Sequence, residues 1–160
     1  MRESLNPTDI FPGIHKTIEM VPEETVERIV ELIHCSRRIE LYAVGSSRMP
    51  GSELAKRLQT IGKAAFCYDD STLMNISARQ LTSDDLVLAL SISGETSLII
   101  AAATVAKSRG AALVSFTNLG NNTLSGMADE KPVCQRHKLC VLRPSGAVPR
   151  TAADAVRIPV

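Results

Sequence analysis

Two short loops rich in hydroxyl groups and glycine hold the residues of this chain best suited to chemistry. The first is Gly45-Ser46-Ser47, and the second is Ser91-Ile92-Ser93-Gly94-Glu95-Thr96. Phosphate recognition needs hydrogen-bond donors that converge on three oxygens, and Ser and Thr hydroxyls are rotatable donors. Glycine lets the backbone approach a ligand closely, and the start of a helix adds unpaired N–H groups and a partial positive charge. The residues of this predicted phosphate site are Gly45, Ser46, Ser47, Ser91, Ser93, Gly94 and Thr96.

The alternative for both loops is helix capping, because Ser, Gly and Thr are common wherever a strand turns into a helix. Two such loops at the same edge of a sheet favour phosphate binding over capping alone. Glu95 does not suit a phosphate cradle. We expect it to be a first-turn carboxylate that points into solvent, with contact to a sugar hydroxyl as the alternative.

The elements that must position these loops follow from hydrophobic patterning. Short apolar runs predict strands over 39–44, 63–68, 86–91 and 112–116. Apolar residues at helical spacing predict helices over 22–36, 51–60, 71–79 and 96–109. The run Leu86-Val87-Leu88-Ala89-Leu90 is apolar throughout, which is typical of a parallel strand covered on both faces.

This alternation of strands and helices predicts a doubly wound α/β domain. We expect a mainly parallel sheet of four to five strands with helices on both faces, in flavodoxin-like layering. Ligands of such sheets bind beyond the carboxyl ends of the strands, near the point where the strand order reverses. Both loops directly follow predicted strands, so they fall at that edge.

The composition of the chain makes some classes of function less favoured. The chain has 160 residues, enough for one domain, with a formal net charge of +1 and only 3% aromatic residues. Few aromatic residues weigh against base-stacking modes of nucleic-acid binding. The first 21 residues look like a linker, and residues 131–160 look like a proline-rich basic tail, with an edge strand possible over 133–142.

The four cysteines form no CxxC pair, so we expect neither a metal site nor a disulfide framework, and no cofactor is implied. Cys35 and Cys67 are expected to be small buried apolar residues. The polar start of the chain and the lack of a long apolar run predict a cytoplasmic protein without a membrane segment.

The second loop resembles the S-x-S-G-x-T signature of the sugar isomerase (SIS) domain family, and Val44-Gly45-Ser46-Ser47 resembles that family's first phosphate loop. The span from Ala43 to Lys63 and the run Phe116-Thr117-Asn118 resemble, more specifically, the effector domain of RpiR-type transcriptional regulators. The resemblance covers residues 22–130 and implies a phosphosugar held by the serines and threonine of both loops. It adds Asn118 to the predicted site and implies a homo-oligomer, a dimer or tetramer formed through helices.

Two departures from the RpiR-type pattern matter. The residues ahead of the first strand hold no three-helix pattern, so DNA binding is expected only through a helix-turn-helix domain that these residues do not contain. The family usually continues with a fifth strand and a closing helix, whereas Pro144 and Pro149 interrupt this tail. Our hypothesis is that the coding sequence departs from the family near residue 130.

SIS domains occur in sensors and in isomerases. Aldose–ketose isomerisation needs a base to move a proton next to a carbonyl, and the candidates are Glu53 and Glu95, with His15, His34 and His137 as the histidines. His34 falls at the end of the first predicted helix, where a histidine is more often structural or exposed, and His15 and His137 lie in poorly organised segments. We expect an effector-sensing domain rather than an enzyme, with a phosphosugar isomerase and a non-functional remnant as the alternatives.

Overall fold

The computed structural model describes residues 19–118, 120–130 and 133–134. They form a five-stranded parallel sheet in the order β2-β1-β3-β4-β5. The strands are β1 (Arg38–Ala43), β2 (Ala65–Tyr68), β3 (Asp85–Leu90), β4 (Ala112–Asn118) and β5 (Val133–Cys134). The order reverses between β1 and β3, as in flavodoxin-like folds. This confirms the predicted fold class.

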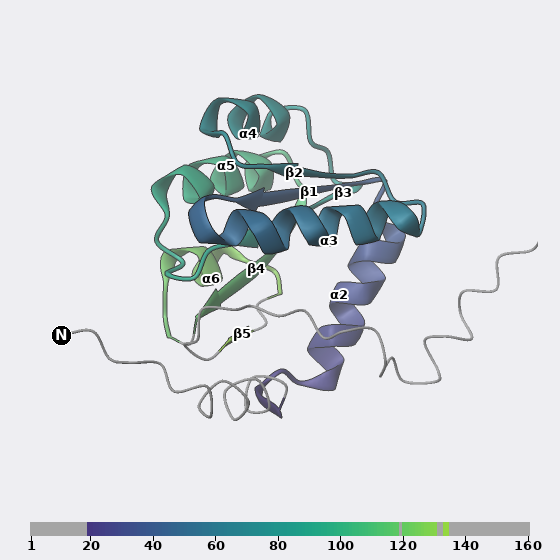
Figure 1. Ribbon diagram of the computed structural model, residues 1–160, viewed down its shortest axis with the longest axis vertical. Helices are drawn as coiled ribbons and strands as arrows, with labels where there is room; N and C mark the ends of the chain where they lie inside the picture. Colours follow the sequence, from purple (N-terminus) through teal and green to yellow (C-terminus); the bar gives the residue numbers. More distant parts are fainter. Residues whose placement is uncertain (1–18, 119, 131–132, 135–160) are drawn as a thin grey trace, which may run out of the picture.

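The helices lie on both faces of the sheet, α4 and α5 on one side and α3 on the other (Figure 1). They are α2 (Glu23–Cys35), α3 (Arg48–Thr60), α4 (Ser71–Ala78), α5 (Ser97–Ser108) and α6 (Thr123–Met127). None of the helices in the described part of the chain is long and apolar enough to cross a lipid bilayer.

The two faces of the sheet carry separate apolar clusters because side chains alternate along each strand. Leu86 and Leu88 of β3 pack with α2 and α3 on one face, whereas Val87 and Ala89 pack with α4, α5 and α6 on the other. All six residues of β3 are buried. As predicted, the apolar run of this strand reflects its coverage by helices on both faces of the sheet.

Helix α3 approaches the sheet closely at Gly51. A Cβ atom at this position would lie 2.9 Å from Ala43 Cβ and 3.2 Å from Cys67 Sγ. The helix begins at Arg48 rather than near Gly51, because Pro50 suits the first turn, where its missing N–H costs no hydrogen bond. Burial raises the pKa of the Cys67 thiol.

A buried polar network lies under α4. Glu40 is fully buried and accepts hydrogen bonds from Tyr42 Oη, at 2.8 Å, and from Ser77 Oγ. Arg38 Nε lies 3.5 Å from Glu40 Oε1. Burial, with the nearby charge of Glu40, raises the pKa of Tyr42, which keeps its phenol in the protonated, donating form.

Several details differ from the sequence prediction. Cys35 is exposed, because it is the last residue of α2 and lies on its outer side; Cys67 is only half-buried. Strand β2 begins at Ala65, two residues after Lys63. Helix α6 was not predicted. Strand β5 falls within the segment 133–142. The rest of that segment, residues 1–18 of the N-terminal linker and the tail from 135 lie outside the described residues.

Candidate functional site

The sheet brings the two hydroxyl-rich loops together at its carboxyl edge. Ala43, the last residue of β1, pairs with Leu90, the last residue of β3. The loops that begin at Val44 and Ser91 therefore leave the sheet side by side, where the strand order reverses. This is the position at which open parallel sheets bind their ligands.

The first loop forms a single 3-10 turn, Gly45–Ser47, that runs into α3. Gly45 has a φ of +59°, a left-handed conformation that favours glycine. The side chain of Ser46 is exposed and that of Ser47 is buried. No side chain caps this turn or the start of α3, so the Ser46 hydroxyl is available to a ligand at this edge.

The second loop is organised by its own hydroxyl groups. Ser91 Oγ and Thr96 Oγ1 lie 2.8 Å apart, and Ser91 Oγ also accepts a hydrogen bond of 3.2 Å from the Gly94 backbone N–H. Ser93 Oγ accepts from the backbone N–H of Glu95 at 3.2 Å. Ser91 is buried at the base of the loop, whereas Ser93 is exposed at its tip.

Helix α5 begins at this loop without a side-chain cap. Thr96 occupies the N-cap position and makes no capping hydrogen bond. The first backbone N–H groups of a helix have no partner within the helix, and the helix dipole places partial positive charge there. A helix of 12 residues that starts among three hydroxyl-bearing side chains is chemically suited to hold an anion such as a phosphate.

The carboxyl end of β4 holds the second loop from the other side. The Asn118 backbone N–H donates to the Ile92 carbonyl at 3.0 Å, and the Ser91 backbone N–H donates to the Phe116 carbonyl at 3.0 Å. The structure thus brings Asn118 next to the second loop, through its backbone. All eight residues of the predicted site lie at the carboxyl edge of β1, β3 and β4.

Sequence reasoning missed Asn122 and Thr123, which contact the second loop from α6. Asn122 caps this helix: its Oδ1 accepts from the Ser125 backbone N–H at 2.9 Å, and its Nδ2 donates to Thr117 Oγ1 at 3.1 Å. The signal that could have found them is an Asn followed three residues later by Ser, a short capping box.

The position of the Glu95 side chain differs from the expectation that it points into solvent. Its side chain is exposed, but it does not simply point into solvent: Oε1 accepts from the Thr123 backbone N–H at 2.7 Å, and Oε2 accepts from Thr123 Oγ1 at 2.8 Å. The backbone bond, followed by the hydroxyl bond, lowers the pKa of Glu95. The carboxylate is therefore kept ionised and turned toward α6.

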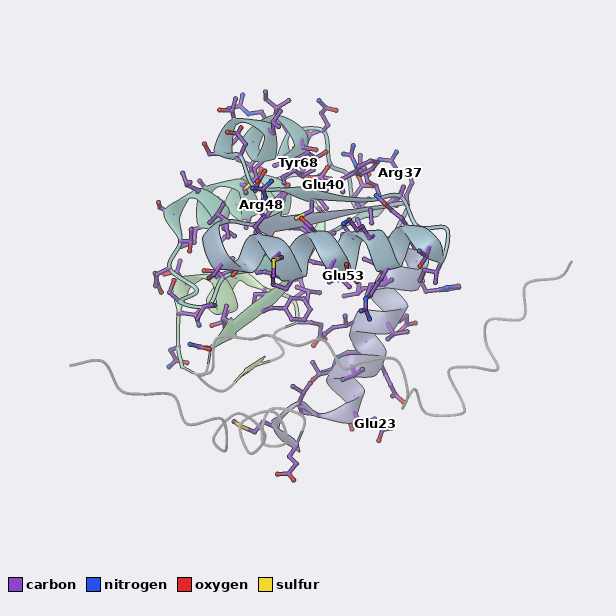
Figure 2. The ribbon with its side chains drawn as sticks, in the orientation of Figure 1. Glu23, Arg37, Glu40, Arg48, Glu53 and Tyr68 are labelled. Carbon is purple, nitrogen blue, oxygen red and sulfur yellow. The ribbon has the colours of Figure 1, made fainter. Side chains whose placement is uncertain are left out.

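Arg48 is a cation at this edge that the sequence analysis did not single out. It follows the first loop directly, and its Nε lies 2.6 Å from Asp69 Oδ2, just after β2. Figure 2 shows Arg48 and Tyr68 toward one end of the sheet and Arg37 toward the other, with Glu40 between them. The side chain of Arg48 is 66% exposed, so its charge is open to solvent beside the first loop.

The other candidate bases lie away from the loops or outside the described residues. Glu53 pairs with Arg57 Nε at 3.0 Å on the exposed side of α3. His34 is exposed at the end of α2, where its carbonyl accepts from Lys63 Nζ at the amino edge of the sheet. His15 and His137 lie outside the described part of the chain.

Comparison with known proteins gives consistent results. The model of the SIS domain family matches residues 32–133. An uncharacterised HTH-type transcriptional regulator of Bacillus subtilis (strain 168), YbbH, is 26% identical over 146 residues, which are 91% of this chain and 49% of that protein.

Two solved structures have a similar fold. The Vibrio vulnificus NanR protein complexed with ManNAc-6P has a TM-score of 0.76 and 35% identity, covering 79% of this chain and 48% of that one. The sugar isomerase domain of an RpiR transcription factor from Sphaerobacter thermophilus has a TM-score of 0.77 and 20% identity, covering 81% and 73%.

The chain spans about half the length of YbbH and of NanR. The matched region contains strands β1 to β4, the first residue of β5 and both hydroxyl-rich loops. The fold and the sequence match agree over the same residues, and this chain belongs to the SIS domain family.

Proposed function

We propose that this domain binds a sugar phosphate as the effector-sensing part of a carbohydrate-responsive transcriptional regulator. The observation that carries the proposal is the uncapped start of α5, which lies among Ser91, Ser93 and Thr96 at the switch point of the sheet. The exposed hydroxyl of Ser46 and the charge of Arg48 border the same edge. A doubly charged phosphate at this place would gain both backbone and hydroxyl donors.

The relatives support both parts of the proposal, regulation and sugar-phosphate binding. YbbH is described as an HTH-type transcriptional regulator, and the NanR structure contains ManNAc-6P. In this chain the phosphate would lie between the two loops. Gly45, Gly94 and Asn118 would shape these loops. The sugar would face Arg48 and Asp69. Neither a metal nor another cofactor takes part.

Ligand binding would act on regulation by shifting the population of oligomer arrangements. In this proposal the protein is cytoplasmic and assembles as a dimer or tetramer. DNA is contacted only through a helix-turn-helix domain outside these residues, whose spacing the sugar phosphate adjusts.

The environment of Glu95 supports binding over isomerisation. A base that removes a proton next to a carbonyl works best with a pKa near the working pH. Both oxygens of Glu95 accept hydrogen bonds from Thr123, and these bonds lower the pKa of its carboxyl. Glu53 is paired with Arg57 on the outer side of α3.

The test is a thermal-shift screen with sugar phosphates, ManNAc-6P among them, and with the matching free sugars as controls. A ligand that binds only the folded state raises the melting temperature. The proposal expects a shift with one phosphorylated sugar, no shift with its free form, and no product on prolonged incubation. Cooperative melting without a shift across the panel would refute it, and turnover would move the assignment to an isomerase.

A further inference from the structure

The second loop is held in two different ways along its length. Its first part is attached to β4, because the Ser91 N–H donates to Phe116 O and Ile92 O accepts from the Asn118 N–H. Its outer part, Gly94 and Glu95, is attached to the first turn of α6 instead. This division makes α6 the support for the part of the loop that leads into α5.

Three contacts form this outer attachment. The Leu124 backbone N–H donates to the Gly94 carbonyl at 3.0 Å. The Glu95 carboxylate accepts both donors of Thr123, at 2.7 and 2.8 Å. Gly94 also packs against the Asn122 side chain without room for a Cβ atom. Two adjacent loop residues therefore meet three consecutive residues: Asn122, which caps α6, and the first two residues of that helix.

The geometry points to Glu95 and Thr123 as a clamp that positions the second loop for its anionic ligand. Glu95 is thus a positioning residue, neither a base nor a ligand contact. This inference rests on the proposed function of the loop as a phosphate site. It assigns a role to the one residue of the signature that a phosphate cradle would otherwise disfavour.

The contact between Glu95 and Thr123 has two effects on ligand binding. It fixes the residues just before α5, so that the N–H groups of the helix start need not be ordered when a ligand arrives, and preordered groups bind more tightly. It also turns a negative charge away from the place where phosphate would sit, because like charges repel. Both effects depend on Thr123, which lies far from Glu95 in the chain.

The experiment compares Thr123→Val, Thr123→Ser, Glu95→Ala and Glu95→Gln with the original chain. Affinities for ManNAc-6P and for inorganic phosphate are measured by calorimetry at pH 8, where a sugar phosphate is doubly charged, together with melting temperatures. Thr104→Val is the matched control, since Thr104 is an exposed threonine whose hydroxyl donates to the Ile100 carbonyl of its own helix.

The clamp predicts that Thr123→Val and Glu95→Ala each weaken phosphate binding about three- to tenfold, the value of one or two hydrogen bonds. A double variant that combines Glu95→Ala with Thr123→Val should bind phosphate no more weakly than the weaker-binding of these two single variants, because both substitutions break the same contact. Thr123→Ser keeps the hydroxyl and should retain affinity. Glu95→Gln keeps an acceptor and loses the charge, so it should bind as tightly as the original chain or tighter.

A different pattern would overturn the clamp. If Glu95→Gln loses as much affinity as Glu95→Ala while Thr123→Val binds normally, the carboxylate contacts the ligand itself. Additive effects of the two substitutions would also refute a shared role.

The clamp can be judged even if the proposed function fails. If the original chain binds neither ManNAc-6P nor phosphate, amide hydrogen exchange of residues 93–96 in the free chain decides. Faster exchange in Thr123→Val than in Thr104→Val would support the clamp without a ligand, and equal exchange would refute it.

Discussion

Gly94 packs so closely against Asn122 that a Cβ atom at position 94 would lie 2.0 Å from the Asn122 Oδ1 atom. Gly94 also has a φ of +67°, in the left-handed region. The residue before Glu95 in the signature is therefore required by two independent constraints, one on the backbone and one on space.

Gly94→Ala should both destabilise the domain and abolish sugar-phosphate binding. We expect a loss of about 2–4 kcal/mol in the free energy of unfolding, from the left-handed backbone and from the overlap. Urea unfolding and the thermal-shift screen measure the two effects. The control is Gly62→Ala: Gly62 has a φ of +83° but nothing within 4 Å of its Cβ position, so it should cost only about 1 kcal/mol and leave binding intact. Equal losses would mean that the contact with Asn122 is unimportant.

The two serines of the signature should separate binding from stability. Ser93 is exposed, so Ser93→Ala should weaken sugar-phosphate binding about three- to tenfold with a stability loss under about 0.5 kcal/mol. Ser91 is buried and bonded to Thr96 and Gly94, so Ser91→Ala should also cost about 1–3 kcal/mol of stability. Calorimetry and denaturant unfolding check both variants. Unfolding of Ser93→Ala would show that its hydroxyl mainly shapes the turn.

Glu40 should be essential for folding but not for ligand recognition. Glu40→Ala leaves the Tyr42 and Ser77 hydroxyls without their buried acceptor and removes the carboxylate that is paired with Arg38, which should cost about 3–5 kcal/mol. Glu53→Ala is the control, because its pair with Arg57 is exposed and should contribute less than about 0.5 kcal/mol. Denaturant unfolding measures both. A Glu40→Ala variant as stable as Glu53→Ala would contradict the network.

The contact of Glu95 with Thr123 should appear in the pH dependence of stability. The pKa of Glu95 is lowered in the folded state from the ordinary value of 4.5, so the folded state favours the ionised carboxylate. Its stabilising effect is fully present above that value and is lost as the pH falls through the folded pKa. The stability difference between the original chain and Glu95→Gln should therefore be constant near neutrality and shrink in acid. Unfolding curves at a series of pH values measure it, and a difference that grows in acid would contradict this account.

The sequence predicted the sheet well because its strands have strong local signals. The apolar run of β3 and the Leu- and Ala-rich α5 are long enough to be recognised without any tertiary information. The start of α3 was misplaced, since Pro50 and Gly51 resemble helix breakers when the neighbouring sheet is unknown. Exposure at helix ends, as for Cys35, depends on tertiary packing that spacing does not reveal.

The loops of the candidate site were found from their residue types, whereas their supports were not. Helix α6 has five residues, too few to show a helical period. The pairing of Glu95 with Thr123 joins two segments on either side of β4, so no local pattern encodes it. Contacts of this kind become visible only when the chain is folded.

The pairing of β1 directly with β3 has a kinetic consequence. The pairing of β1 with β3 makes the two hydroxyl-rich loops neighbours, and α3, β2 and α4 all lie between these two strands in the chain. Pairing distant segments requires closing a long chain loop before any contact repays the lost entropy. The ligand edge should therefore be completed late in refolding, after the local helices, so that recovery of ligand binding lags behind recovery of helical signal after dilution from denaturant.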